Sequence, residues 1–220
     1  MNSKDHLFLV KFTIPIPMKI LAVGKNYLKH VKEFDNVVPD EPVIFTKPDT
    51  ALLLNNQPFY YPDFSQNIHY ETELVIKIDK EGKHIDEVFA ENYYSQIALG
   101  IDFTARDLQL KAKEAGLPWA LSKGFNGAAP VSSFIDITSL KDPDNITFHL
   151  TINEQERQRG SSSDMLFSFN RIISYISRFI LLKKGDLIFT GTPEGVGPIA
   201  IGDQLAGYIE HHKMLDFEIK

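Results

Sequence analysis

Short alternating runs of apolar and polar residues dominate the chain and predict strands rather than long helices. Runs of this kind, with proline, glycine, asparagine or aspartate near their ends, occur at 42–49, 73–79, 146–153, 186–192 and 203–210. Helical spacing of apolar residues is found at 91–101, which leads into 103–116, and again at 162–180. We expect Gly116 to follow the end of the first helical region, and Ser163 or Asp164 to cap the last. The pattern therefore predicts a single β-rich domain with a few helices.

Length and composition agree with one soluble globular domain. The chain has 220 residues, 43% of them hydrophobic and 24% charged, with a formal net charge of −6. A chain of this size buries about 70% of its unfolded surface, so one core suffices. The acidic balance argues against nucleic acid as a partner. The chain contains no cysteine, which excludes disulfides, thiolate metal sites and cysteine nucleophiles.

The first seventeen residues have a pattern of their own. Their apolar run, residues 7–10, is short, is interrupted by Lys11 and is followed by two prolines, so it resembles neither a signal peptide nor a membrane span. A strand running into a glycine turn begins at Met18. We therefore predict an N-terminal extension of unknown role at 1–17 and one catalytic domain at 18–220, in a cytoplasmic protein that is not associated with a membrane.

The stretch HYETELVIKI, residues 69–78, places two acidic side chains on one face of a predicted strand. Alternation directs Glu71 and Glu73 to the same side, opposite an apolar face. Same-face neighbours on a strand lie about 7 Å apart, so two partly buried carboxylates repel unless one is protonated or a cation lies between them. The alternative is a solvated strand face. Glu154 and Glu156 share the spacing, but their hydrophilic surroundings predict a hairpin turn with solvated charges.

A third acidic residue, Asp102, follows the apolar run 97–101, so its carboxylate is expected to be buried and to need a partner. Arg106, four residues later, would be that partner if this stretch is helical. Alternatively, Asp102 gathers with Glu71 and Glu73 around one metal ion. Three hard oxygen ligands suit Mg²⁺ or Mn²⁺ better than Zn²⁺.

From Met18 onward the chain resembles the fumarylacetoacetate hydrolase superfamily. The resemblance rests on the segments MKILAVGKNYLKHVKEF, PVIFTKP, YETELVIKI, GIDFTARDLQ, LPWALSKGFNGAAPV, SSSDMLFSFNRIISYIS and LLKKGDLIFTGTPEGVG, in that order. It implies an α+β, β-rich fold, a mixed β-roll with a few peripheral helices. It also implies a homodimer that acts on small 2-oxo acids or their enols.

The resemblance assigns a role to each matching position. Glu71, Glu73 and Asp102 match the residues that bind Mg²⁺ or Mn²⁺. His30 and Glu33 match a dyad in which the carboxylate orients an imidazole that deprotonates water. Lys123 matches a lysine that stabilises oxyanion charge. Four further residues match substrate-binding positions: Arg106, Gln109, Thr192 and Lys47. Without the resemblance, several of these residues have ordinary structural explanations. Lys123 would be a solvated turn lysine, Thr192 would belong to a glycine-rich loop between strands, and His30 and Glu33 would form a surface pair.

Departures from the family pattern concern the neighbourhood of the proposed lysine. Asn126 stands where the family commonly has aspartate, and Ser132 and Ser133 stand where it has Gly-Pro. These differences predict an altered substrate shape with the chemistry retained.

The short chain and the closely spaced His30 and Glu33 resemble the acylpyruvate hydrolase branch. We therefore expect a Mg²⁺- or Mn²⁺-dependent hydrolase that cleaves the C–C bond of short acylpyruvates to pyruvate and a carboxylic acid, with oxaloacetate decarboxylation as a second activity. One alternative is a 2-hydroxyhepta-2,4-diene-1,7-dioate-type isomerase or decarboxylase of aromatic catabolism. The other is a non-catalytic metal-binding protein.

The segment 26–34, NYLKHVKEF, predicts a short helical lid over the site. Asn26 is a candidate N-cap, and a helical wheel separates an apolar arc, which includes Val31 and Phe34, from His30 and Glu33. The segment has only about two turns, too few for a stable isolated helix. We therefore expect its order to depend on contacts that include the substrate.

Overall fold

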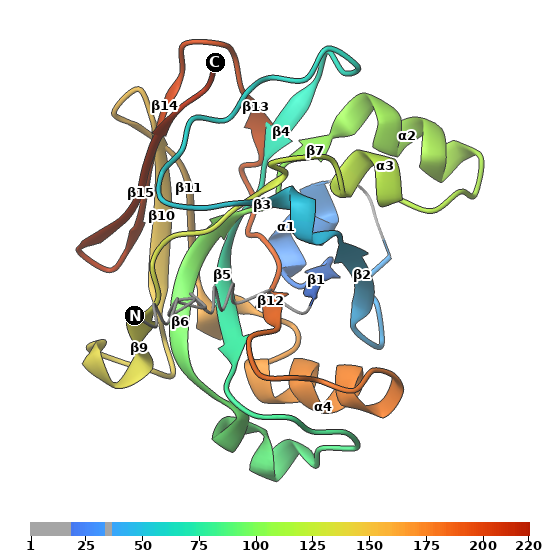
Figure 1. Ribbon diagram of the computed structural model, residues 1–220, viewed down its shortest axis with the longest axis vertical. Coiled ribbons are helices and arrows are strands. Elements are labelled where there is room, and N and C mark those ends of the chain that lie inside the picture. Colours follow the sequence, from blue (N-terminus) through green and yellow to red (C-terminus); the bar gives the residue numbers. More distant parts are fainter. Residues whose placement is uncertain (1–18, 34–36) are drawn as a thin grey trace, which may run out of the picture.

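Strands form most of the regular structure in the computed structural model, which describes residues 19–33 and 37–220 (Figure 1). In the order of hydrogen-bonded neighbours, the largest sheet contains β2 (Val43–Lys47), β1 (Ile20–Gly24), β12 (Leu187–Phe189), β5 (Thr72–Ile78), β6 (Tyr94–Ile101) and β9 (Ile135–Asp136). β1 and β12 are parallel, whereas the other pairs in this sheet are antiparallel. The sheet is therefore mixed, as the resemblance implies.

A second, antiparallel sheet packs against the first. Its strands, in spatial order, are β11 (Gln155–Ser161), β10 (Thr147–Ile152), β14 (Gln204–Ile209) and β15 (His212–Glu218). The two sheets approach closely at Gly207 of β14, because a Cβ atom there would lie 2.5 Å from Leu99 Cδ2 of β6. The core lies between them and is fully apolar at this level, with Leu99, Phe148 and Leu205 buried.

The remaining elements are short and lie around the sheets. One small sheet has the order β13 (Gly197–Pro198), β4 (Ile68–Tyr70) and β7 (Thr104–Ala105). Another pairs β3 (Leu52–Leu53) with β8 (Ala129–Pro130). The helices are α1 (Leu28–Glu33), α2 (Arg106–Glu114), α3 (Ala120–Lys123) and α4 (Phe169–Phe179), with 3₁₀ turns at Asp49–Ala51, Glu87–Tyr93, Ile137–Ser139 and Ser162–Asp164. Figure 1 shows α2 and α3 at one end of the large sheet and α4 at the other.

The α+β, β-rich fold class is confirmed, and each of the five predicted strands overlaps an observed strand. Helix α2 is followed by Gly116 with φ 64°, as expected for the residue after the C-cap Ala115. Within the residues that the structure describes, no helix is long and apolar enough to cross a membrane. The predicted extension at 1–17 lies outside the described residues.

Two helix predictions were wrong. Residues 91–101 do not form a helix, because Tyr94–Ile101 is strand β6, whose last five residues are buried. A short apolar run of this kind fits a strand buried on both faces as well as it fits a helix. The predicted helix 162–180 is shortened to α4, which begins at Phe169. Its cap is Ser168, whose hydroxyl accepts a hydrogen bond from Arg171 N–H, rather than Ser163 or Asp164.

Candidate active site

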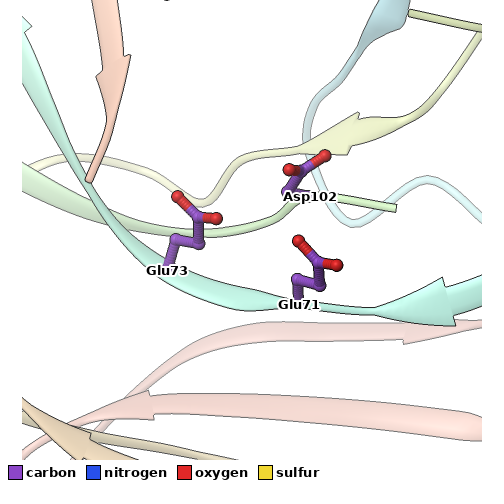
Figure 2. A group of neighbouring side chains, drawn as sticks. All are labelled: Glu71, Glu73 and Asp102. Carbon is purple, nitrogen blue, oxygen red and sulfur yellow. The ribbon is translucent and has the colours of Figure 1, made fainter. Parts of the chain in front are cut away.

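The register of β5 and β6 brings the three acidic residues together. The predicted strand 69–78 is interrupted at Glu71, which lies between β4 and β5, while Glu73 is the second residue of β5. Thr72 pairs with Ile101 in the antiparallel ladder, so Asp102 comes opposite Glu71, and the Asp102 N–H donates to the Glu71 carbonyl at 2.7 Å. Figure 2 shows the three carboxyl groups turned toward one another.

The acidic group is buried and has the donors that a hard cation needs. Glu71, Glu73 and Asp102 are 5%, 2% and 1% exposed, and one ligand oxygen from each lies within 4.8 Å of the others. Carboxylate oxygens are the usual protein ligands of Mg²⁺ and Mn²⁺. Among the described residues, Glu73 has no ion-pair partner, and one hydrogen bond, from Gly191 N–H at 2.7 Å, reaches its Oε2 atom. The donor set therefore fits a divalent cation.

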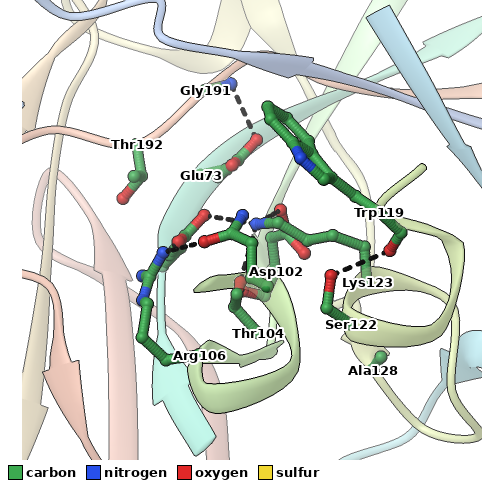
Figure 3. Close-up of polar contacts among 12 residues, drawn as sticks. Glu73, Asp102, Thr104, Arg106, Trp119, Ser122, Lys123, Ala128, Gly191 and Thr192 are labelled. Atoms are coloured by element: carbon green, nitrogen blue, oxygen red, sulfur yellow. Dashed lines mark hydrogen bonds and ion pairs between the residues drawn. The ribbon is translucent and has the colours of Figure 1, made fainter. Parts of the chain in front are cut away.

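Three buried cations surround the acidic group. Lys123, the last residue of α3, donates from Nζ to Glu71 Oε2 at 2.7 Å and to Asp102 Oδ2 at 2.6 Å. Arg106, at the start of α2, donates from Nη2 to Glu71 Oε1 at 2.6 Å. Lys47, at the end of β2, lies 2.6 Å from Asp102 Oδ1. Figure 3 shows Arg106 and Lys123 approaching the acidic group from opposite sides.

The electrostatic surroundings separate the two glutamates. Burial raises the pKa of Glu71, but Lys123 and Arg106 outweigh burial and hold that pKa below its usual value. Burial also raises the pKa of Glu73, and the neighbouring charges of Asp102 and Glu71 raise it further. Lys123 shows the reciprocal effect, since the Asp102 and Glu71 carboxylates outweigh burial and raise its pKa. Among the described residues Glu73 is thus the acidic residue without an ion-pair partner, and the Gly191 N–H and the charge of Lys123 only partly offset the rise in its pKa.

A turn after β12 closes one side of the centre. β12 pairs with β5, so the residues that follow it run beside Glu73 and Thr72. Gly191 has φ 100°, a conformation that L side chains rarely adopt, and a Cβ atom there would lie 2.6 Å from Asn26 Cβ. The next residue, Thr192, donates from its hydroxyl to the Thr72 carbonyl at 2.9 Å. Glycine is therefore required where the turn donates its N–H to Glu73.

Helix α1 brings the predicted dyad to the pocket. His30 Nδ1 lies 3.1 Å from Glu33 Oε2, and Gly195 N–H donates to Glu33 Oε1 at 3.2 Å, which ties the helix to the loop after β12. Val31 is buried, as the predicted apolar arc requires, whereas Leu28 is 39% exposed. Phe34, the last residue of that arc, lies outside the described residues.

Asn26 has a different role from the predicted cap. Its side-chain Oδ1 accepts from Phe167 N–H at 2.8 Å, and its Nδ2 donates to the carbonyls of Phe167 and Thr190. These bonds join the start of α1 to two distant loops. The amide of Asn26 therefore anchors the segment instead of capping it.

One pocket contains most of the predicted site residues. Its lining includes, from that set, His30, Glu71, Glu73, Asp102, Arg106, Gln109, Lys123 and Thr192. Lys47 is not part of the lining, since its ammonium is directed at Asp102 and at two backbone carbonyls, one of them that of Ala128 at 3.1 Å. Glu33 reaches the pocket through His30. The predicted Asp102–Arg106 ion pair is absent from the structure, because Arg106 binds Glu71.

Six further residues line the pocket that the sequence did not single out: Val23, Gly24, Lys25, Phe45, Lys113 and Trp119. The rings of Phe45 and Trp119 pack edge to face at 5.9 Å and form an aromatic wall. Gln158 supports the site from outside the lining, because its Nε2 donates to the Thr192 hydroxyl and its Oε1 accepts from Thr72 N–H. A signal existed for Lys113, which shares a helical face with Arg106 and Gln109 at spacings of three and four residues.

The fold and the site together define a β-rich protein with a buried centre able to hold a divalent cation beside a basic pocket. The chain belongs to the fumarylacetoacetate hydrolase family, since the family described as fumarylacetoacetate (FAA) hydrolase C-terminal matches residues 19–220.

Relatives and solved structures agree with this assignment. Over 201 residues, the chain is 43% identical to the protein from Mus musculus named oxaloacetate tautomerase FAHD1, mitochondrial, with 91% of each chain covered. The structure superposes with a TM-score of 0.86 on fumarylpyruvate hydrolase from Pseudomonas aeruginosa in complex with Mn²⁺ and pyruvate, at 34% identity, covering 91% of this chain and 88% of that one. With 2-hydroxyhepta-2,4-diene-1,7-dioate isomerase from Mycobacterium marinum the TM-score is 0.79, at 34% identity, covering 91% and 73%.

Proposed function

We propose that the protein is a divalent-metal-dependent enzyme of small 2-oxo acids whose main reaction is the interconversion of the enol and keto forms of oxaloacetate. The observation that carries the proposal is the buried acidic centre of Glu71, Glu73 and Asp102, enclosed with Lys123 and Arg106 in one pocket. The relative at 43% identity is named as an oxaloacetate tautomerase, which supports the choice of reaction.

Glu71, Glu73 and Asp102 would hold Mg²⁺ or Mn²⁺, a cation that, when bound, polarises the oxygens of a chelating 2-oxo acid. The balance of charge between the three carboxylates and the cations paired with them supports this assignment. The three carboxylates are matched by Lys47, Lys123 and Arg106, and a divalent cation adds two positive charges that the carboxylate and the C2 oxygen of an enolate would balance.

Basic side chains of the chain stabilise the enolate that forms as the proton moves. The ammonium of Lys123 and the guanidinium of Arg106 are fixed by ion pairs before the substrate arrives, so they need little reorganisation when negative charge develops at the C2 oxygen. The Gln109 side chain is held by Arg106, because Arg106 Nη1 donates to Gln109 Oε1 at 2.6 Å. Arg106 and Gln109 therefore position the substrate as one unit.

His30 is the proposed acid–base residue. It lines the pocket, and the Glu33 carboxylate at 3.1 Å holds its imidazole in one orientation. In the conversion of enol to keto form, His30 delivers a proton to C3 while the enol hydroxyl loses its proton to water, and His30 then regains a proton from water. Glu33 acts through His30 and is a positioning residue.

The same dyad favours a second candidate function, hydrolysis of the C–C bond of short acylpyruvates. Here His30 removes a proton from a water molecule, the resulting hydroxide attacks the distal carbonyl, and the C–C bond breaks to give a carboxylic acid and the pyruvate enolate, which is then protonated. A solved structure similar to this chain is named fumarylpyruvate hydrolase, which supports this candidate. Decarboxylation of oxaloacetate forms the same enolate without the attacking water.

The experiment separates these reactions with one enzyme preparation. The ultraviolet absorbance of the oxaloacetate enol is followed after addition of protein loaded with Mn²⁺ or treated with EDTA, and pyruvate is measured in the same samples and with acetylpyruvate as substrate. A metal-dependent loss of the enol without pyruvate supports the tautomerase. Pyruvate from acetylpyruvate supports the hydrolase instead, isomerisation only of dienedioates supports that alternative, and no reaction with any of these substrates supports a non-catalytic metal-binding protein.

We also propose that the protein is a homodimer, as the resemblance implies. Light scattering coupled to size-exclusion chromatography measures the mass directly. A monomer mass at micromolar concentration would contradict this proposal.

A further inference from the structure

The outer part of the pocket carries two lysines that the chemistry above does not use. Lys25 and Lys113 line the same pocket as Glu71 and Arg106, and Trp119 lies beside them. The ammonium of Lys113 is 5.9 Å from the centre of the Trp119 ring. In the part of the chain that the structure describes, neither lysine forms an ion pair with a carboxylate.

The local structure explains why the two lysines face the pocket. In α2, Arg106, Gln109 and Lys113 are separated by three and four residues, so they lie along one face of the helix. Lys25 follows β1 with φ 61°, in the left-handed region that lysine rarely adopts. Burial lowers the pKa of Lys113, and Arg106 and Lys25 lower it further, which agrees with their proximity.

The cations around the acidic centre already form ion pairs with its carboxylates. Lys123 binds Glu71 and Asp102, Lys47 binds Asp102, and Arg106 binds Glu71. These cations balance the acidic centre, and the positive charges of the outer lysines are left over. An anion that enters the pocket therefore meets a second basic region, separate from the one that holds its reacting end.

We propose that Lys113 and Lys25 form a subsite for the distal carboxylate of a 2-oxo dicarboxylate, so that the pocket selects dicarboxylates over 2-oxo acids with a neutral tail. This inference rests on the proposed function, because it takes the 2-oxo end of the substrate to lie at the acidic centre. The Lys113 ammonium lies over the face of the Trp119 ring at the rim of the pocket. A carboxylate forms charge-assisted hydrogen bonds with ammonium groups, which are shorter and stronger than hydrogen bonds between neutral groups.

The subsite acts on binding rather than on the chemical step. In the interconversion of the enol and keto forms, its contacts are made to a part of the substrate that does not react, so they are equally strong in the ground state and in the transition state. Loss of Lys113 should therefore raise KM for dicarboxylates and leave kcat nearly unchanged. The charge of both lysines also predicts that the preference weakens at high ionic strength.

The test compares two unreactive ligands of equal chain length, 2-oxoglutarate and 2-oxopentanoate, by calorimetry on Mn²⁺-loaded protein. We expect the wild-type protein to bind the dicarboxylate about tenfold more tightly, the effect of one good charge-assisted hydrogen bond. Lys113→Met should reduce the preference to about twofold or less, and Lys25→Asn, which suits the left-handed backbone, should reduce it in part. Lys111→Met is the matched control, since Lys111 lies on the same helix but does not line the pocket.

Steady-state kinetics supply the second measurement. With Lys113→Met, KM for oxaloacetate should rise about tenfold and kcat should stay within about twofold, while acetylpyruvate, which has a neutral tail, should be handled as by the wild-type protein. An unchanged ligand preference in Lys113→Met, or an equal loss in Lys111→Met, would overturn the subsite. If no 2-oxo acid is turned over but the dicarboxylate preference exists and depends on Lys113, the proposed function fails and the subsite stands.

Discussion

Replacement of each glutamate of the acidic centre by glutamine should have opposite effects on the stability of the metal-free protein. Glu71 binds the guanidinium of Arg106 and the ammonium of Lys123 at 2.6 and 2.7 Å. Glu71→Gln leaves these buried cations without a full partner, and breaking a buried ion pair in this way costs about 3–5 kcal/mol. The variant should therefore be strongly destabilised.

Glu73→Gln should be neutral or stabilising. Burial and the adjacent carboxylates of Asp102 and Glu71 raise the pKa of Glu73, which means that its charge is unfavourable here. Glutamine keeps an oxygen that can accept from Gly191 N–H, and it removes the repulsion. A gain of about 1 kcal/mol corresponds to less than one pKa unit of relief. The two isosteric variants should thus differ by at least about 3 kcal/mol, or about 6–12 °C in Tm for a chain of this size.

Urea unfolding in EDTA measures the stabilities, and Mn²⁺ titration calorimetry measures metal binding. Both variants remove a ligand, so both should lose at least about tenfold in Mn²⁺ affinity despite their opposite stabilities. Equal destabilisation of the two variants would refute the assignment of the ion pairs. Unchanged Mn²⁺ affinity in both would refute the three-carboxylate centre.

Four further variants test the surroundings of this centre. Lys123→Met should lower kcat by about 10²–10³, as for loss of one oxyanion donor, and an effect on KM alone would show a purely binding role. His30→Ala and Glu33→Ala should suppress acylpyruvate hydrolysis far more than oxaloacetate decarboxylation, because only hydrolysis needs an activated water. Pyruvate release measures both reactions, and equal losses in both would contradict the role of His30 in activating water. Gly191→Ala should cost about 1–3 kcal/mol from its φ of 100° and should weaken Mn²⁺ binding through Glu73, whereas wild-type Tm and affinity would contradict the required turn.

The strands were predictable because their signal is local. Alternation and turn residues identify β5, β10 and β14 without any knowledge of their neighbours. Helix α4 was predicted too long, since apolar residues at 162–168 continue the spacing although the chain there is irregular. β6 was mistaken for a helix because burial on both faces removes the alternation that marks a strand.

The acidic residues of the site were accessible to sequence analysis, and their partners were not. Glu71, Glu73 and Asp102 stand out because they interrupt apolar surroundings. The partners come from far along the chain, since Lys123 is 52 residues from Glu71. Lys47 lies 55 residues from Asp102. No periodicity encodes such pairs, and only the tertiary fold brings them together.

The opposition of Glu71 and Asp102 across the β5–β6 hairpin also bears on how the protein folds. A hairpin with two carboxylates face to face is disfavoured while it stands alone, because like charges on opposite strands repel. The ammonium of Lys123 can relieve that repulsion only after α3 has docked, and α3 follows the hairpin in the chain. This end of the hairpin is therefore expected to become ordered late, after the apolar part between Leu74 and Leu99 has formed. The local repulsion that opposes the final fold is confined to residues that would hold the metal. The arrangement of this centre therefore slows the folding of this end of the hairpin.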